Sequence, residues 1–491
     1  MRRTIVIWMM GAVALAVVSA TGAHAEARKP NILFVLIDDM GWPDLACYGH
    51  AFHETPRLDQ LASEGVRFTD FYATPVCSST RATIEAGQNS ARVGITDFLP
   101  GHWKPFAQLV VPPMPDHLDH NLTTPGEALG AAGYVTGYFG KWHLGRGTDN
   151  TPRAHGYQVT DAELGDAFRE WRGGRDKGPK RMDLITDQAI WFLRHHAGKG
   201  QPFFLHVSHH AVHIPIQAKQ DSIAKYINKP KPDSGVNHPV YAAMIEDLDA
   251  QIGRLLDKLD ELHLAEDTVV MVASDNGGLR QTFTGNGQIV STNAPLRAEK
   301  GTLYEGGIRV PLIVRWPGVA PPGADCHELA ATWDLLPTFC AIAGIAPPDQ
   351  PLDGVDISSL LRDPHASLDR DVLYFHYPHY HHSRPAGAIR RGDLKLVEWF
   401  DDGSVELYNL AADIGESNDL ATTMPEKVKQ MRDDLTAWRQ RVGARLPTKN
   451  PNYVAEKADD WWNRRTNAPR GLKAFGDSLE QGASKENLRA R

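Results

Sequence analysis

The sequence contains several groups of reactive side chains, and the first is the pair Asp38-Asp39. The pair follows the apolar run 31–37, which has the length of one β-strand. Two adjacent carboxylates behind a buried strand repel each other unless a cation lies between them. The alternative is a turn with a helix-capping Asp, which is common for one Asp and less so for two. The pair therefore favours a cation site.

A second group surrounds Cys77, in the stretch Pro-Val-Cys-Ser-Ser-Thr-Arg-Ala-Thr at 75–83. A helix is predicted over 78–86, which places Cys77 at its N-terminus. Amide groups and the helix dipole favour an anion there. A Cys before a helix is usually a small buried apolar side chain, so the function of Cys77 depends on the rest of the chain.

Three further groups also follow apolar runs. Lys141 and His143 lie in Gly-Lys-Trp-His-Leu-Gly at 140–145, and the stretch 208–215 contains His209, His210 and His213. Three His side chains suggest zinc, but their spacing is not the i, i+4 helical spacing of metalloproteases. The third group is Ser-Asp-Asn-Gly-Gly at 274–278.

Strand-length apolar runs alternate with helical patterns, which predicts an α/β fold built on a buried, mostly parallel sheet. The predicted strands are 31–37, 68–73, 134–139, 203–207, 268–273 and 312–315. In such sheets ligands bind at the carboxyl ends of the strands. Because the polar groups follow strand after strand, we expect them to meet at one edge.

Taken together, these groups resemble the signatures of the formylglycine-dependent (type I) sulfatases of the alkaline-phosphatase superfamily. In that family a Cys followed four residues later by Arg becomes an aldehyde; here these are Cys77 and Arg81. The usual pattern is Cys-x-Pro-Ser-Arg, or the same pattern with Ala in place of Pro. Here Ser79 stands at the Pro or Ala position and Thr80 stands at the Ser position. The segments 140–145 and 296–311 match other family motifs, and the resemblance spans about 31–447. Within this family, the chain looks most like bacterial carbohydrate sulfatases and arylsulfatase A-like enzymes.

The resemblance implies a large mixed, mostly parallel sheet sandwiched by helices, plus a small C-terminal antiparallel sheet with a packed helix. The expected organisation is a signal peptide at 1–25, a catalytic domain at 26–371, a C-terminal subdomain at 372–448 and a charged tail at 449–491. Trp461 and Trp462 suggest that this tail docks. Thr124 and Thr423 are each expected to begin a capping box.

The resemblance also implies one divalent metal ion, held by Asp38, Asp39, Asp275 and Asn276 beside the modified Cys77. These protein ligands are all oxygen donors, which suits calcium, with magnesium also possible.

The remaining roles also follow from the resemblance. Arg81 and the metal would hold the hydrated aldehyde made from Cys77, while Lys141 and Lys300 contact the sulfate oxygens. His213, with Lys300, would protonate the departing alcohol. His143 would take a proton from the second hydroxyl of the hydrate, which expels sulfate and restores the aldehyde.

The implied activity is removal of sulfate from a sulfated carbohydrate, with a formylglycine-generating maturase as a partner during biogenesis. One alternative is a phosphomonoester or phosphonate ester hydrolase of the same superfamily. The other is a sulfated-glycan-binding protein in which Cys77 stays an unmodified thiol.

The net charge and the N-terminal sequence indicate where the protein is located and which partners are expected. Arg2 and Arg3, an apolar stretch and Ala23-His24-Ala25 form a signal-peptide pattern, so we expect cleavage after Ala25 and a periplasmic or secreted protein. Cleavage removes two positive charges, which takes the formal net charge from −8 to −10. We therefore expect no nucleic-acid partner and no membrane attachment after processing. Cys326 and Cys340 are equally compatible with a disulfide and with free thiols.

Overall fold

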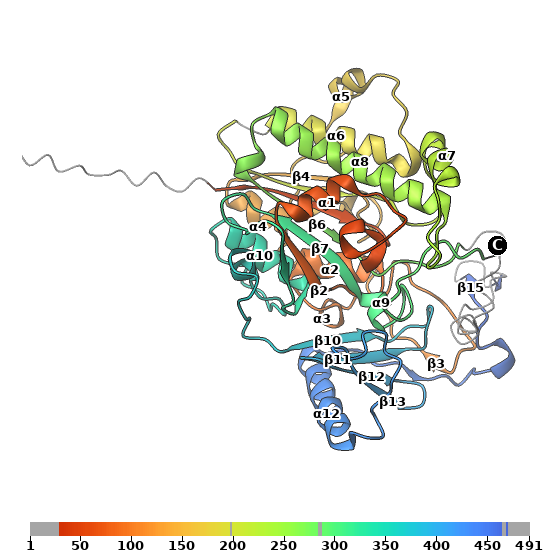
Figure 1. Ribbon diagram of the computed structural model, residues 1–491. Coiled ribbons are helices and arrows are strands. Elements are labelled where there is room, and N and C mark those ends of the chain that lie inside the picture. The colour runs from red at the N-terminus through yellow and green to blue at the C-terminus, as the bar shows by residue number, and fades with distance from the viewer. Residues whose placement is uncertain (1–28, 197–198, 283–286, 464–467, 470–491) are drawn as a thin grey trace, which may run out of the picture.

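The fold is built around one eight-stranded sheet with the order β4-β5-β1-β6-β7-β2-β8 and β9 paired with β2. The computed structural model describes residues 29–196, 199–282, 287–463 and 468–469 (Figure 1). The predicted signal peptide and its cleavage site lie outside these residues. The strands are β1 (Asn31–Ile37), β2 (Val66–Tyr72), β4 (Val135–Gly140), β5 (Phe203–Ser208), β6 (Thr268–Ser274), β7 (Arg309–Arg315), β8 (Ala324–Cys326) and β9 (Ala330–Ala331).

Most neighbours in the sheet are parallel, as the sequence predicted. β4, β5, β1 and β6 all run in one direction. β7 is antiparallel to both β6 and β2, so its first residue, not its last, lies at the carboxyl edge of the parallel strands. The segment before β7 reaches this edge for that reason.

β1 is buried on both faces of the sheet, which explains its continuous apolar sequence. Leu33, Val35 and Ile37 pack into one hydrophobic cluster and Ile32, Phe34 and Leu36 into the other. Successive side chains of a strand point to opposite faces, so one seven-residue run contributes to two cores.

Helices cover both faces of the sheet (Figure 1). One face packs against α1 (Pro56–Ser63), α6 (Met182–His196) and α8 (Pro239–Glu261), with α7 (Gln220–Asn228) against α8. The other face packs against α2 (Cys77–Ala86), α4 (Pro125–Ala131), α10 (Leu335–Ile342) and α11 (Ser358–Arg362). The remaining short α-helices that precede the second sheet in the chain are α3 (Ser90–Val93), α5 (Gly165–Arg172) and α9 (Glu305–Ile308).

A separate four-stranded antiparallel sheet follows in the chain and lies below the main sheet in Figure 1. Its strands are β10 (Val372–Tyr377), β11 (Ala386–Arg391), β12 (Leu394–Trp399) and β13 (Val405–Asn409). One face packs on the part of the chain that contains the main sheet, where Phe375 of β10 and Trp333 belong to the same hydrophobic cluster. The other face packs on α12 (Pro425–Val442), where Leu396 meets Leu435. The predicted mixed sheet with a smaller antiparallel sheet is confirmed.

Of the two predicted capping boxes, one is confirmed and one is wrong. The Thr124 hydroxyl accepts from the Glu127 N–H, and the Glu127 carboxylate accepts from the Thr124 N–H. At α12 the N-cap is Met424 instead, and the Thr423 hydroxyl donates to the Leu420 carbonyl. Pro425 is the reason, because a residue before proline is disfavoured in the helical conformation that a cap at Thr423 would require of Met424.

The described part of the C-terminal tail docks on the loop that follows α3. β14 (Thr448–Lys449) pairs with β3 (Leu109–Val110). The Trp461 ring lies 4.0 Å from the His102 ring, and the Trp462 ring lies 5.3 Å from the Phe106 ring. A last two-stranded ribbon pairs β15 (Trp462–Asn463) with β16 (Ala468–Pro469).

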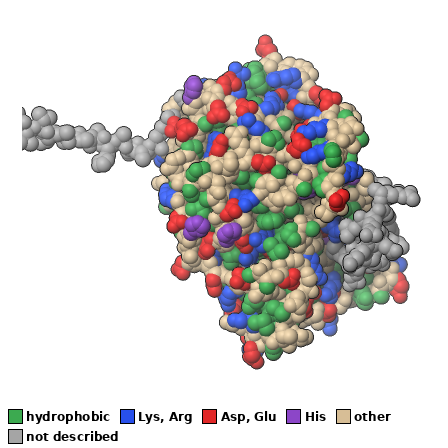
Figure 2. Space-filling model, in the orientation of Figure 1, with side chains coloured by type: hydrophobic (Ala, Val, Ile, Leu, Met, Phe, Trp, Pro, Cys, Tyr) green, Lys and Arg blue, Asp and Glu red, His purple; other side chains and the backbone are tan. Residues whose placement is uncertain are grey.

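Three properties of the whole molecule bear on its chemistry. All four cysteines are free, so Cys326 and Cys340 form no disulfide. Among the described residues, no helix has the combination of length and apolar character needed to cross a bilayer. On the face drawn in Figure 2, Lys and Arg side chains are interspersed with Asp and Glu. The described part of this face therefore carries no broad basic patch that would attract an anion.

Candidate active site

Each of the two carboxylates after β1 is held by a lysine. The two lysines come from segments next to strands on opposite sides of β1 in the strand order. Lys141 follows β4 and donates to both carboxylate oxygens of Asp38, at 2.8 and 2.7 Å. Lys300 precedes α9 and donates to both oxygens of Asp39, at 2.6 and 2.8 Å. Burial alone raises the pKa of Asp38, but Lys141 and the neighbouring cations outweigh it and hold that pKa well below its usual range. Both carboxylates are therefore ionised.

Arg81 joins the Cys77 helix to the strand ends. Its Nε and Nη2 donate to one oxygen of Asp275, at 3.1 and 2.7 Å, and its Nη1 donates to the Ser208 hydroxyl and the Lys141 carbonyl. Asp275 also accepts from the Asp39 N–H at 3.1 Å. Arg81 is 2% exposed and Asp275 is fully buried, so this pair is shielded from water.

The predicted metal ligands come together, and their donor atoms fit a hard divalent cation. Asp38, Cys77 and Asp275 offer ligand atoms that all lie within 4.8 Å of one another. The Asn276 side-chain N–H donates to Asp39 at 2.8 Å, whereas its buried Oδ1 has no hydrogen-bond partner among the described residues. A buried carbonyl oxygen without a partner is costly, and a cation satisfies it.

The charges around this position balance before any cation is added. Asp38, Asp39 and Asp275 carry three negative charges, and their partners Lys141, Lys300 and Arg81 carry three positive ones. A bound divalent cation would leave the buried centre with a net charge of about +2, from the sum of these formal charges. Such a centre attracts an anionic ester.

Cys77 is the first residue of α2 and faces His143. The Cys77 Sγ lies 3.2 Å from His143 Nδ1, and His143 Nε2 lies 2.9 Å from the Leu99 carbonyl. A carbonyl only accepts, so Nε2 carries the ring proton and Nδ1 presents a lone pair to residue 77. Burial, with the charges of Lys141 and Arg81, lowers the pKa of His143 to about 3. The ring is therefore a neutral base.

His213 lies on the other side of the acidic pair. Its Nδ1 lies 2.6 Å from the Ile214 carbonyl, so Nε2 is the atom directed at Asp39, 3.6 Å from its carboxylate. The side chain is 32% exposed, in contrast to the buried Asp39. His213 is therefore the site residue that an incoming ester meets from solvent.

Two contributions to this site could not be predicted from the sequence. The Ser78 hydroxyl donates to the His143 carbonyl at 2.8 Å and accepts from the Leu99 N–H at 3.0 Å, so it joins the two segments that hold His143. The Leu99 carbonyl fixes the tautomer of His143. Leu99 lies in the long loop after α3, and only a long-range contact reveals its role.

Ser79, at the position where the family has Pro or Ala, is part of a local hydroxyl cluster. It is fully buried, donates to the Val76 carbonyl at 2.8 Å and contacts the Thr74 hydroxyl at 2.5 Å. The extra hydroxyl therefore has partners within the turn that leads into α2.

Four further polar residues, His209, Arg280, His376 and His379, have different environments. His379 lines two cavities beside the site. His209 is fully buried, and His376 is buried against the Arg445 carbonyl at 3.0 Å, so neither is a surface ligand. The Arg280 N–H donates to the Glu299 carboxylate at 2.7 Å.

Comparison with known proteins identifies the chain. The family model "Sulfatase" matches residues 30–345, and the model for the C-terminal part of N-sulphoglucosamine sulphohydrolase matches residues 298–441. Arylsulfatase A of Homo sapiens is 31% identical over 92% of this chain and 95% of its own length. N-acetylgalactosamine-6-sulfatase of Homo sapiens is 33% identical over 72% of this chain and 70% of its own.

Solved structures show the same fold at lower identity. One, a complex with its substrate D-glucosamine-2-N,6-O-disulfate, has a TM-score of 0.67, 22% identity and coverage of 85% of this chain and 98% of its own. The phosphonate monoester hydrolase of Agrobacterium radiobacter has a TM-score of 0.63, 18% identity and coverage of 90% and 99%. Since the fold is shared by both activities, the assignment rests on the sequence matches. The chain belongs to the sulfatase family and is an enzyme of that class.

Proposed function

We propose that this sulfatase removes sulfate from a sulfated carbohydrate. The observation that carries the proposal is the contact between Cys77 and a neutral His143 base, beside two lysine–carboxylate pairs. The relative N-acetylgalactosamine-6-sulfatase is named for a sulfated sugar, and its match covers 72% of this chain. A sulfated sugar is therefore the substrate class that we assign.

Cys77 is the residue that we expect to be converted to formylglycine by a maturase. The aldehyde, as its hydrate, supplies the hydroxyl that attacks sulfur. The position supports this role, because Cys77 is the first residue of α2, where amide groups favour developing negative charge. Burial raises the pKa of the Cys77 thiol, which disfavours a thiolate nucleophile at this position.

Asp38, Asp39, Asp275 and Asn276 are the residues that we expect to hold one calcium ion. A bound cation at this position supplies a fixed positive charge that offsets the negative charge of the sulfate group. The protein's own part is to hold the four oxygen donors in place, through Lys141 on Asp38 and Lys300 on Asp39. The donor set contains only carboxylate and amide oxygens, which suits calcium better than zinc.

His143 and His213 have different proton-transfer roles in this proposal. His143 Nδ1 accepts the proton of the hydroxyl on residue 77 when sulfate departs, and its Nε2–H stays bound to the Leu99 carbonyl. When both of its ring nitrogens are protonated, with Nδ1–H on the Ile214 carbonyl and Nε2–H beside Asp39, His213 donates the Nε2 proton to the oxygen of the leaving alcohol. Lys141 and Lys300 place their ammonium groups where charge develops on the sulfate oxygens.

The second candidate is hydrolysis of phosphate or phosphonate monoesters, favoured by the fold shared with a phosphonate monoester hydrolase. Comparing kcat/KM for 4-nitrophenyl sulfate, 4-nitrophenyl phosphate and a panel of sulfated sugars separates the two. The sulfatase proposal requires the sulfate esters to be turned over faster. A peptide mass at Cys77 checks the aldehyde, since an unmodified thiol in inactive protein would instead favour a sulfated-glycan-binding role.

The signal pattern supports export as a further part of the proposal. We expect processing after Ala25, export to the periplasm or the medium, and functional units at 26–371, 372–448 and 449–491. N-terminal sequencing of the exported protein checks the cleavage, and a sequence that begins at Met1 would contradict it.

A further inference from the structure

The C-terminal tail forms one wall of a cavity beside the candidate active site. The two matched family models end at residues 345 and 441, so the tail lies beyond the parts they describe. The Asn450 side-chain amide donates to the Pro105 and Ala107 carbonyls, at 2.9 and 2.7 Å, and its oxygen accepts from the Asn452 N–H at 3.0 Å. Asn450 thus fixes the tail on the loop after α3.

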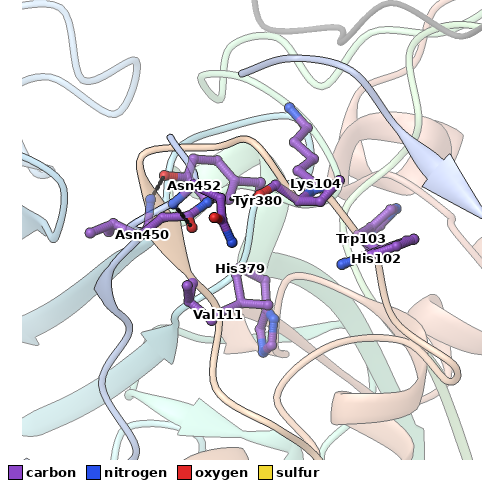
Figure 3. A pocket seen from close by; sticks show the side chains of 11 residues that line it. His102, Trp103, Lys104, Val111, His379, Tyr380, Asn450 and Asn452 are labelled. Atoms are coloured by element: carbon purple, nitrogen blue, oxygen red, sulfur yellow. Dashed lines mark hydrogen bonds between the residues drawn. The ribbon is translucent and has the colours of Figure 1, made fainter. Parts of the chain in front are cut away.

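This cavity, called here the tail cavity, has a volume of about 300 Å³. It is lined by three stretches that are far apart in the sequence: the loop 102–111, the turn after β10 with His379 and Tyr380, and the tail with Asn450 and Asn452 (Figure 3). This volume is within the range of small-molecule sites in proteins.

Aromatic and polar groups face each other in the tail cavity. The Tyr380 hydroxyl accepts from the Leu109 N–H at 3.0 Å, which leaves its own hydrogen for another acceptor. Asn452 has an exposed side chain that offers both a donor and an acceptor. Aromatic faces combined with amide and hydroxyl groups suit a sugar ring, which has apolar faces and a rim of hydroxyls.

The tail also positions Tyr380 through Lys104. The Lys104 ammonium lies 5.5 Å from the Tyr380 ring centre and 5.3 Å from that of Trp461, and it pairs with Asp459 at 3.3 Å. The Lys104 side chain is only 5% exposed. Because Asp459 and Trp461 belong to the tail, docking of the tail holds the wall that carries Tyr380.

A second cavity lies between the tail cavity and the loop residue Leu99, which contacts His143. It has a volume of about 370 Å³ and shares His102, Val111 and His379 with the tail cavity. Leu99 also lines it, and the Leu99 carbonyl is the partner of His143 Nε2. The second cavity is therefore linked to residue 77 through two contacts, that of Leu99 with His143 and that of His143 with Cys77.

We propose that the tail cavity is a subsite for another sugar unit of the chain that carries the sulfated one, and that the tail makes the enzyme select oligosaccharides over monosaccharides. This rests on the proposed function, because the sulfated unit itself must lie at Cys77. Asn452 and Tyr380 hydrogen-bond this other sugar unit, and Asn450 and Lys104 are positioning residues.

The test compares three substrates: 4-nitrophenyl sulfate, N-acetylgalactosamine 6-sulfate and a chondroitin 6-sulfate tetrasaccharide. The readout is the ratio of kcat/KM for the tetrasaccharide to kcat/KM for the monosaccharide. We expect Asn452→Ala and Tyr380→Phe each to lower this ratio about 5- to 10-fold, the effect of one lost hydrogen bond. Deletion of 448–491 should lower it further.

The matched control is Glu456→Ala, an exposed tail residue that does not line the cavity. It should leave the ratio unchanged. If the tail deletion fails to fold, the single variants still decide, and equal ratios in wild type, Asn452→Ala and Tyr380→Phe overturn the subsite.

The outcomes for the subsite and for the proposed function are distinct. Wild type that cleaves both sugars with no preference for the tetrasaccharide overturns the subsite and leaves the proposed function standing. Wild type that cleaves 4-nitrophenyl sulfate but none of a wider panel of sulfated mono- and oligosaccharides overturns both.

Discussion

His143 Nδ1 lies 3.2 Å from Cys77 Sγ, and the other nitrogen of the same ring is held by the Leu99 carbonyl. The tautomer of this base is therefore set by a loop residue far from the motif that contains it. Its lowered pKa, about 3, keeps the ring neutral at neutral pH. A neutral base at residue 77 can accept a proton, and the contact with that residue distinguishes His143 from His213, which faces Asp39 instead.

The first prediction concerns His143→Ala. The first half-reaction should proceed while the release of sulfate stops, so the protein should gain the mass of one covalent sulfate at residue 77. Intact-protein mass after mixing with 4-nitrophenyl sulfate checks this, with the exposed His365→Ala as control. A variant that turns over slowly without any adduct would contradict the role of His143.

The second prediction concerns His213→Ala, whose effect should depend on the leaving group. For a sulfated sugar, we expect kcat to fall about 10²-fold or more, because a sugar alkoxide leaves poorly without a proton. For an aryl sulfate the loss should be smaller, since a phenol leaves readily. Equal losses on both substrates would show that His213 is not the acid.

The third prediction concerns Cys77→Ala. Turnover should fall by about 10⁴-fold or more, as expected for removal of a nucleophile, with the far-ultraviolet circular dichroism unchanged. Cys47→Ala is the matched control, because Cys47 packs beside α1 and away from the site, and it should retain full activity. Activity retained by Cys77→Ala would exclude formylglycine chemistry at this residue.

The fourth prediction concerns the metal. Chelation should abolish activity and lower the melting temperature, and calcium should restore both, since a ligand at 100 times its Kd stabilises by about 2.7 kcal/mol. Asn276→Ala removes the buried Oδ1 and should weaken calcium affinity by about 10-fold or more, measured by the calcium-dependent shift in melting temperature. Elemental analysis that finds two zinc ions per chain would favour the phosphatase alternative.

The fifth prediction contrasts two adjacent serines of α2. Ser79→Ala removes only local hydrogen bonds, so it should cost about 1 kcal/mol of unfolding free energy with kcat unchanged. Ser78→Ala removes the link between the His143 and Leu99 segments and should lower kcat about 10-fold, with little change in KM. Denaturant unfolding and steady-state kinetics measure both. Identical kinetics in the two variants would show that Ser78 does not position His143.

The sequence was most informative where local physics decides the structure. The apolar run of β1 predicted a strand buried on both faces, and Thr124 with Glu127 predicted a helix start that the structure has. The Thr423 cap was wrong because Pro425 moves the start of α12 by one residue.

Relationships between distant segments were beyond the sequence. The antiparallel direction of β7 brings Lys300 to the site from the start of a strand, and the sequence does not reveal that direction. The bond from His143 to Leu99 and the docking of the tail on 103–110 depend on packing between loops, which no periodicity encodes.

The order of the sheet gives the pair Asp38-Asp39 a central position. Lys141 comes from β4, two strands to one side of β1, and Lys300 precedes β7, two strands to the other side. The two lysines thus reach the pair across the strands on either side of β1, so their approach depends on how these strands pack. Substitutions inside the buried faces of β4 or β7 would change which tetrahedral anion fits, so directed evolution of anion preference should yield mutations deep in the sheet as well as at the pocket.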